Sequence, residues 1–86
     1  MNVQELFKTE LSKIPAEQRR QVDFSWAIAD KIDMLLKQRK ISYKDFAKMT
    51  NSSLSEIMEW LGGTYNFSLE TLAKISAALG ENLITV

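Results

Sequence analysis

Two successive helix-start signals within residues 42–61 constrain the fold of this chain more than any other feature of its sequence. Ser42 is followed three positions later by Asp45, and Ser53 by Glu56. In each pair the hydroxyl can accept a free backbone N–H of the first helical turn, while the carboxylate reaches back to the cap residue. The sequence therefore predicts two short helices in direct succession, the first with the weaker cap because it has Asp in place of Glu or Gln.

The residues between and around these caps predict how the two helices cross. Asn51 lies where the chain must reverse, and Asn tolerates the left-handed backbone conformation well. Ala47, four residues before it, allows a close crossing that the branched Ile57, six residues after it, can fill. Phe46 and Trp60 add apolar contacts toward a common core. This pattern favours a helix-turn-helix, whose second helix enters a DNA major groove, although a tight helical hairpin would need only the apolar positions.

The composition limits the class of protein. The chain has 86 residues, 45% of them hydrophobic and 26% charged, which predicts one small packed domain. It has no Cys and no His, and no Gly-rich phosphate loop, so we expect no enzyme, no metal site and no cofactor. No apolar run is long enough to span a bilayer and the N-terminus lacks a signal-peptide core, so we expect a cytoplasmic protein with no membrane contact.

Two helical segments are predicted before the motif. Residues 2–14 carry an apolar stripe that Pro15 ends, and this helix either covers the core or associates with a partner or a second copy; the stripe is Val3, Leu6, Phe7, Leu11 and Ile14. A further segment starts at Pro15. Asp23 can cap a separate core helix over residues 24–38, which gives an N-terminal helical extension over 1–23 and a helix-turn-helix domain over 24–80.

Two features of this sequence leave alternatives open. Trp26 falls outside the apolar stripe of its helix, and either packs under the N-terminal helix or is exposed at an interface. The β-branched tail predicts a short strand over residues 81–86. That strand pairs with a second copy across a two-fold axis, forming a homodimer, or folds back over its own chain.

Glycines and a serine mark the remaining boundaries. Gly62 and Gly63 are predicted to end the second motif helix because they adopt left-handed geometry without a side-chain penalty. Ser68 is predicted to cap a further helix, and Gly80 to end it.

Residues 28–80 resemble the Cro/repressor-type helix-turn-helix family, also called the xenobiotic-response-element family, of bacterial and phage regulators. The resemblance is strongest in SEIMEWLGGTYNFSLETLAKISAALGENLITV, where Ser-Leu-Glu-Thr-Leu and Ala-Leu-Gly follow in the family's order. It implies an all-α, lambda-repressor-like five-helix bundle. The whole chain also looks like a subgroup of small regulators that includes antitoxins of toxin–antitoxin pairs.

The resemblance implies a sequence-specific DNA-binding transcriptional regulator, a repressor that binds double-stranded DNA as a homodimer. The alternative is an antitoxin-like interaction module that binds a toxin or another protein and touches DNA weakly. Carried over by position, the base contacts fall on Leu54, Ser55, Met58 and Glu59, and the phosphate contacts on Tyr43, Thr64 and Asn66.

The chain departs from the family at three places. Tyr43 stands where the family usually has Gln, Asn51 where it commonly has Gly, and the charges of the recognition helix are Glu56 and Glu59 instead of basic groups. A carboxylate can accept from cytosine N4, but phosphate repels it.

Positive charges gather near the first motif helix. They are Lys37, Arg39, Lys40, Lys44 and Lys48. They form either an ordinary solvated face or, with Lys44 and Lys48 nearest the DNA, a surface that neutralises phosphates.

Overall fold

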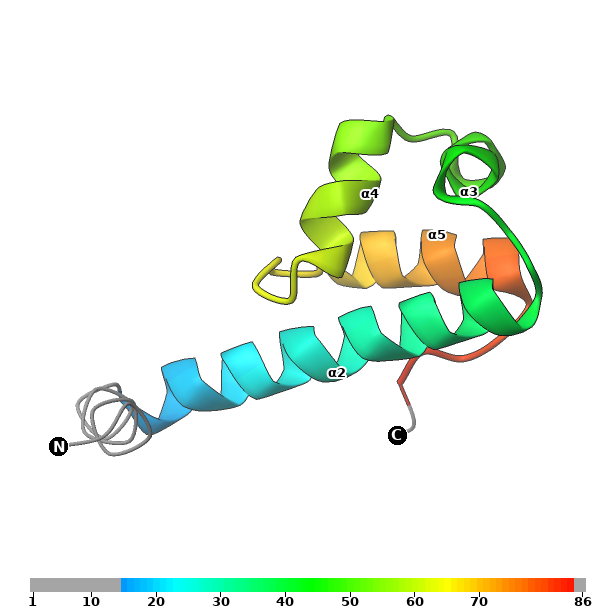
Figure 1. The fold of residues 1–86 in the computed structure, drawn as a ribbon. Coiled ribbons are helices and arrows are strands. Elements are labelled where there is room, and N and C mark those ends of the chain that lie inside the picture. The colour runs from blue at the N-terminus through cyan, green and yellow to red at the C-terminus, as the bar shows by residue number, and fades with distance from the viewer. Residues whose placement is uncertain (1–14, 85–86) are drawn as a thin grey trace, which may run out of the picture.

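The computed structural model describes residues 15–84, which form four helices and no strand. The helices are α2 (Ala16–Gln38), α3 (Tyr43–Thr50), α4 (Leu54–Leu61) and α5 (Leu69–Leu79) (Figure 1). The described part of the chain therefore confirms the all-α prediction, but it has four helices in place of the expected five-helix bundle. The helix expected over residues 2–14 lies outside the described residues, as do residues 85 and 86.

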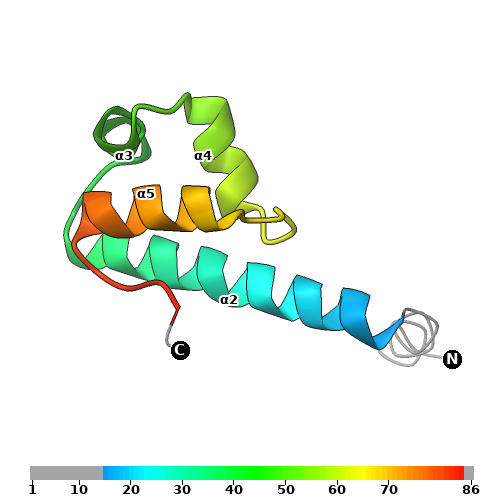
Figure 2. The ribbon, with the colours of Figure 1, turned by 180° about the vertical axis from the view of Figure 1, so that it is seen from behind.

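α2 is one continuous helix of 23 residues, about 35 Å long at 1.5 Å per residue. It begins after Pro15 and passes through Asp23 without a break, so the predicted cap at Asp23 is wrong. No Gly or Pro interrupts residues 16–38. Once a helix has formed, each further residue adds a backbone hydrogen bond, so a break at Asp23 would lose such bonds. The first half of α2 extends beyond the rest of the bundle, whereas its second half packs within it (Figures 1 and 2).

α2 ends at a residue in the left-handed conformation. Lys40 has φ 56°, its N–H donates to the carbonyl of Lys37 (3.2 Å), and the N–H of Ile41 donates to that of Leu36 (2.9 Å). These two bonds satisfy carbonyls that the helix end leaves free. Beside this turn the Arg39 guanidinium donates to the carbonyl of Leu79 and to the Glu81 carboxylate, which ties the end of α2 to the end of α5.

The turn between α3 and α4 confirms the predicted reversal. Asn51 has φ 53° and ψ 46°, in the left-handed region, and the N–H of Ser52 donates to the carbonyl of Ala47 at 2.8 Å. The turn occupies only residues 51–53. A turn this short between two crossing helices is typical of a helix-turn-helix.

The two predicted caps both form, and they differ. The Ser53 hydroxyl accepts the N–H of Glu56 (3.1 Å) while the Glu56 carboxylate accepts the N–H of Ser53, which completes a capping box. The Ser42 hydroxyl accepts the N–H of Asp45 (3.1 Å), and the structure records no return bond from the Asp45 carboxylate. The shorter Asp side chain explains the weaker cap.

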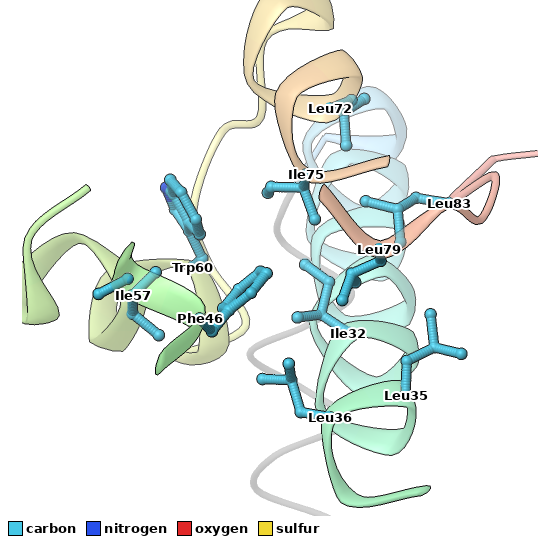
Figure 3. Close-up of a cluster of buried hydrophobic side chains, with 11 residues drawn as sticks. Ile32, Leu35, Leu36, Phe46, Ile57, Trp60, Leu72, Ile75, Leu79 and Leu83 are labelled. Carbon is cyan, nitrogen blue, oxygen red and sulfur yellow. The ribbon is translucent and has the colours of Figure 1, made fainter. Parts of the chain in front are cut away.

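The core joins all four helices, and Figure 3 shows most of its members. Ala47 on α3 and Ile57 on α4 are both buried in this cluster, and the two helices contact each other, as their spacing predicted. Phe46 and Trp60 meet edge to face with ring centroids 6.0 Å apart. The buried cluster consists of Ile32, Leu35, Leu36, Phe46, Ala47, Ile57, Trp60, Leu72, Ile75, Leu79 and Leu83.

The described residues after α5, 81–84, do not form the predicted strand. Gly80 ends α5 with φ 63°, as expected, and residues 81–84 then fold back onto the core. Leu83 is buried among the core residues, whereas Ile84 is partly exposed. The buried Leu83 holds the described tail against its own chain. The tail is held by apolar contact with the core and not by pairing with another strand.

Gly63, and not Gly62, needs to be a glycine. Gly62 has a right-handed φ of −69°, but Gly63 has φ 90°. A Cβ on Gly63 would also lie 2.7 Å from ring carbons of Trp26. One part of the Trp26 ring lies on Gly63, and 49% of the residue remains exposed.

Ser25 anchors the loop between α4 and α5 to α2. Its buried hydroxyl donates to the carbonyl of Tyr65 at 2.8 Å. Tyr65 and Phe67 pack edge to face, with centroids 4.9 Å apart. The loop thus has a fixed position at the C-terminal end of α4.

Candidate nucleic-acid interface

The outer face of α4 presents all four residues that sequence comparison assigns to base contact. Ile57 and Trp60 turn into the core, which orients the opposite side of the helix outward. Leu54 and Met58 are 51% and 44% exposed, and Ser55 and Glu59 are also exposed. The structure brings these four side chains onto one accessible surface, which we call the α4 face.

The α4 face has two chemically different edges. At about 100° per residue, Leu54 and Met58 lie within about 40° of each other and form an apolar edge. Glu56 and Glu59 lie on the opposite side of Ser55 and form an acidic edge. The Glu56 carboxylate turns back to the N-cap, so Glu59 is the carboxylate that faces outward freely. The α4 face therefore offers two apolar groups, one hydroxyl and one free carboxylate.

α3 supplies the positive charge beside this face. Lys44 and Lys48 are four residues apart on one side of α3 and are exposed. Within residues 15–84, neither forms an ion pair with a carboxylate. Both ammonium groups are thus available to a phosphate.

Two other basic residues of the predicted cluster are already paired. Lys37 Nζ lies 2.7 Å from Asp33 Oδ2, and Arg39 contacts Glu81 at 3.1 Å. These contacts stabilise the surface of the domain instead of leaving the charges unpaired. The structure thus separates the predicted cluster into two paired groups at the C-terminal end of α2, Lys40 in the turn that follows, and two available lysines on α3.

Tyr43, predicted to contact phosphate, is hydrogen-bonded within the domain. Its hydroxyl donates to Asp33 Oδ1 at 2.9 Å. The hydrogen bonds from Lys37 and then Tyr43 lower the pKa of the Asp33 carboxyl below its usual value. The same carboxylate raises the pKa of the Tyr43 hydroxyl and of the Lys37 ammonium. Sequence reasoning missed Asp33, although its spacing of four from Lys37 predicts an ion pair.

Thr64 and Asn66 lie in the loop that follows α4. Both are exposed. The loop is at the end of α4 opposite to the α3–α4 turn (Figure 1). Tyr43 and Lys44 lie in the first turn of α3, whereas Thr64 and Asn66 follow α4, so the predicted phosphate contacts come from the beginning and the end of the motif.

Two further observations concern the described residues only. None of the four helices combines the length and the apolar content required to cross a bilayer. No three His, Cys, Asp or Glu side chains in residues 15–84 gather closely enough to hold a metal ion.

The short turn, the crossing at Ala47 and the exposed α4 face define a helix-turn-helix of the DNA-binding class. The family model of the Cro/C1-type helix-turn-helix DNA-binding domain matches residues 31–84. The chain belongs to this family, which confirms the resemblance drawn from the sequence. No curated protein and no solved structure matches the chain significantly.

Proposed function

We propose that this protein is a sequence-specific transcriptional regulator, a repressor that binds double-stranded DNA in the cytoplasm and has no catalytic activity. The observation that carries the proposal is the position of α4, whose inner side is held by Ile57 and Trp60 while its outer face is free. In a helix-turn-helix the second helix reads base edges in the major groove, and the first crosses the backbone. Lys44 and Lys48 on α3 support this placement.

The length of α4 supports binding as a homodimer. Eight residues span about 12 Å, so one copy reaches only a few base pairs. Two copies related by a two-fold axis would place their recognition helices about one DNA turn apart and read a palindrome. The described tail, residues 81–84, packs on the core of its own chain through Leu83.

Selection of bound duplexes from a random pool tests this proposal. The full chain should recover a palindromic consensus with half-sites about 10 base pairs apart, centre to centre. Sedimentation with the selected duplex should give two chains per site. A pool that remains random after repeated selection would contradict sequence-specific binding.

The acidic and apolar composition of the α4 face favours one second candidate function. Glu59 repels phosphate, and the exposed Leu54 and Met58 suit contact with another protein. An antitoxin-like module would use this surface to bind a toxin protein and touch DNA weakly. Failure of the selection, together with binding of the purified product of the adjacent gene, would favour this candidate.

A further inference from the structure

α4 lacks the side chains that usually read purines in the major groove. Guanine is usually read by Arg or Lys and adenine by Asn or Gln, through paired hydrogen bonds in the major groove. The α4 sequence LSEIMEWL contains none of these four residue types. The α4 face therefore cannot form the paired hydrogen bonds by which these side chains recognise a purine edge.

The groups that α4 does offer match pyrimidines. The apolar edge of Leu54 and Met58 can pack against the C5-methyl of thymine, the one apolar group that a base presents in the major groove. The free carboxylate of Glu59 can accept from the N4 amino group of cytosine. Ser55, between the two edges, can bond to either kind of base.

We propose that α4 reads thymine methyl groups through Leu54 and Met58, and an adjacent cytosine through Glu59. This proposal rests on the proposed function. Sequence choice then depends chiefly on apolar contact, in place of paired hydrogen bonds to purines. The half-site consensus should be rich in thymine on the strand that faces the apolar edge. It should have cytosine at the position that Glu59 contacts.

Replacing thymine by uracil in the selected duplex tests this directly, because the change removes only the methyl group. Each contacted thymine replaced should weaken binding about fourfold, the factor expected for burial of one methyl-sized group. Uracil placed outside the half-sites should have no effect. Binding that is insensitive to uracil at every half-site position would overturn the inference and leave the proposed function standing.

Variants of α4 complete this test. The exposed Leu54→Ala and Met58→Ala should fold, as circular dichroism can verify, and each should lose sensitivity to uracil at one thymine. Ser55→Ala should keep the full sensitivity. If no duplex is selected at all, the proposed function fails as well, and the two failures are therefore distinguishable.

An apolar groove follows the first part of α2 and the loop before α5. The groove has a volume of about 590 Å³, and its α2 lining runs from Glu17 to Ile28. Phe67 and Leu72 contribute to its apolar lining. Phe24 also lines the groove and is 62% exposed. Exposure of so much apolar surface to water is unfavourable in free energy.

The chain itself has a segment of suitable pattern and length at the end of this groove. Residues 1–14, outside the described part, join α2 through Pro15, next to Glu17. As a helix, residues 2–14 would be about 20 Å long, and the groove side of α2 between residues 17 and 28 spans about 17 Å. The predicted apolar stripe of this segment faces one direction, as a covering helix requires.

We infer that residues 2–14 of the same chain dock in this groove as an antiparallel helix that turns back at Pro15. Their apolar stripe then covers Phe24 and Ile28. A short connection between neighbouring antiparallel helices is the usual form of a helical hairpin.

Disulfide trapping in the full chain tests the docking, and the chain has no native cysteine to interfere. In the variant Phe7→Cys/Gln21→Cys, the cross-link should form within one chain. It should form at least tenfold faster than in Lys8→Cys/Gln21→Cys, because Lys8 has nearly the same tether but lies on the polar side of the segment. Equal rates, or no cross-link in either variant, would overturn docking; a cross-link between chains would assign the groove to a second copy instead.

A measurement with Phe7 intact guards against loss of docking through the cysteine itself. Leu11→Asp should raise the fluorescence of a bound hydrophobic dye severalfold by uncovering the groove, whereas Ser12→Asp should not. The same dye signal from both variants would also contradict the inference.

Discussion

At the scale of single residues, Gly63 is the position where the fold tolerates least change. Gly63→Ala combines a left-handed φ, which costs about 1–2 kcal/mol for an L-residue, with overlap on the Trp26 ring, which costs about 1–3 kcal/mol more. We expect a loss of about 2–5 kcal/mol in the free energy of unfolding, measured by urea denaturation.

Gly62→Ala is the matched control for that substitution. Gly62 has a right-handed φ of −69°, and an added Cβ would meet only ordinary contacts at 3.4 and 3.5 Å. This substitution should leave the stability unchanged or raise it by about 0.4–1 kcal/mol. Equal losses in the two variants would mean that Gly63 is not pressed against Trp26.

At the scale of elements, the crossing of α3 and α4 depends on the small size of Ala47. Ala47 is 7% exposed and lies in the core with Ile57. Ala47→Leu adds three carbons where the helices approach, so we expect a loss of about 1–3 kcal/mol. Lys48→Leu places the same side chain on the exposed side of α3 and should change the melting temperature little. An unchanged melting temperature in Ala47→Leu would contradict the close crossing.

The elements also show what the sequence could predict. The caps at Ser42 and Ser53 and the reversal at Asn51 are set by neighbours within a few residues, so local chemistry predicted them. The outward position of the α4 face followed from the same spacing. The break at Asp23 was wrongly predicted. A residue that can cap a helix marks a helix start only where no helix already runs through it, and α2 continues through Asp23.

Contacts between distant residues were beyond local reasoning. The burial of Leu83, the contact of Trp26 with Gly63 and the bond from Tyr43 to Asp33 each join segments whose approach depends on the whole fold. Of the candidate site, the sequence therefore located the elements and the exposed residues. It did not reveal that Tyr43 was already hydrogen-bonded to a carboxylate.

At the scale of the whole molecule, zero net charge means that attraction to DNA must come from where the charges lie. Lys44 on α3 is placed to contact a phosphate, whereas Arg19, in the first turn of α2, lies at the far end of the molecule from α3. Lys44→Ala and Arg19→Ala change the net charge equally. They therefore separate a local phosphate contact from a general loss of positive charge.

Each phosphate contact contributes about 0.9 to the slope of log K against log salt. Lys44→Ala should therefore flatten that slope by about 0.9 and weaken binding to all sequences alike. Arg19→Ala should leave the slope unchanged. Titrations of the selected duplex between about 50 and 200 mM salt measure both slopes. If the two variants give equal slopes, Lys44 does not contact phosphate, and α3 does not cross the DNA backbone on the side that carries it.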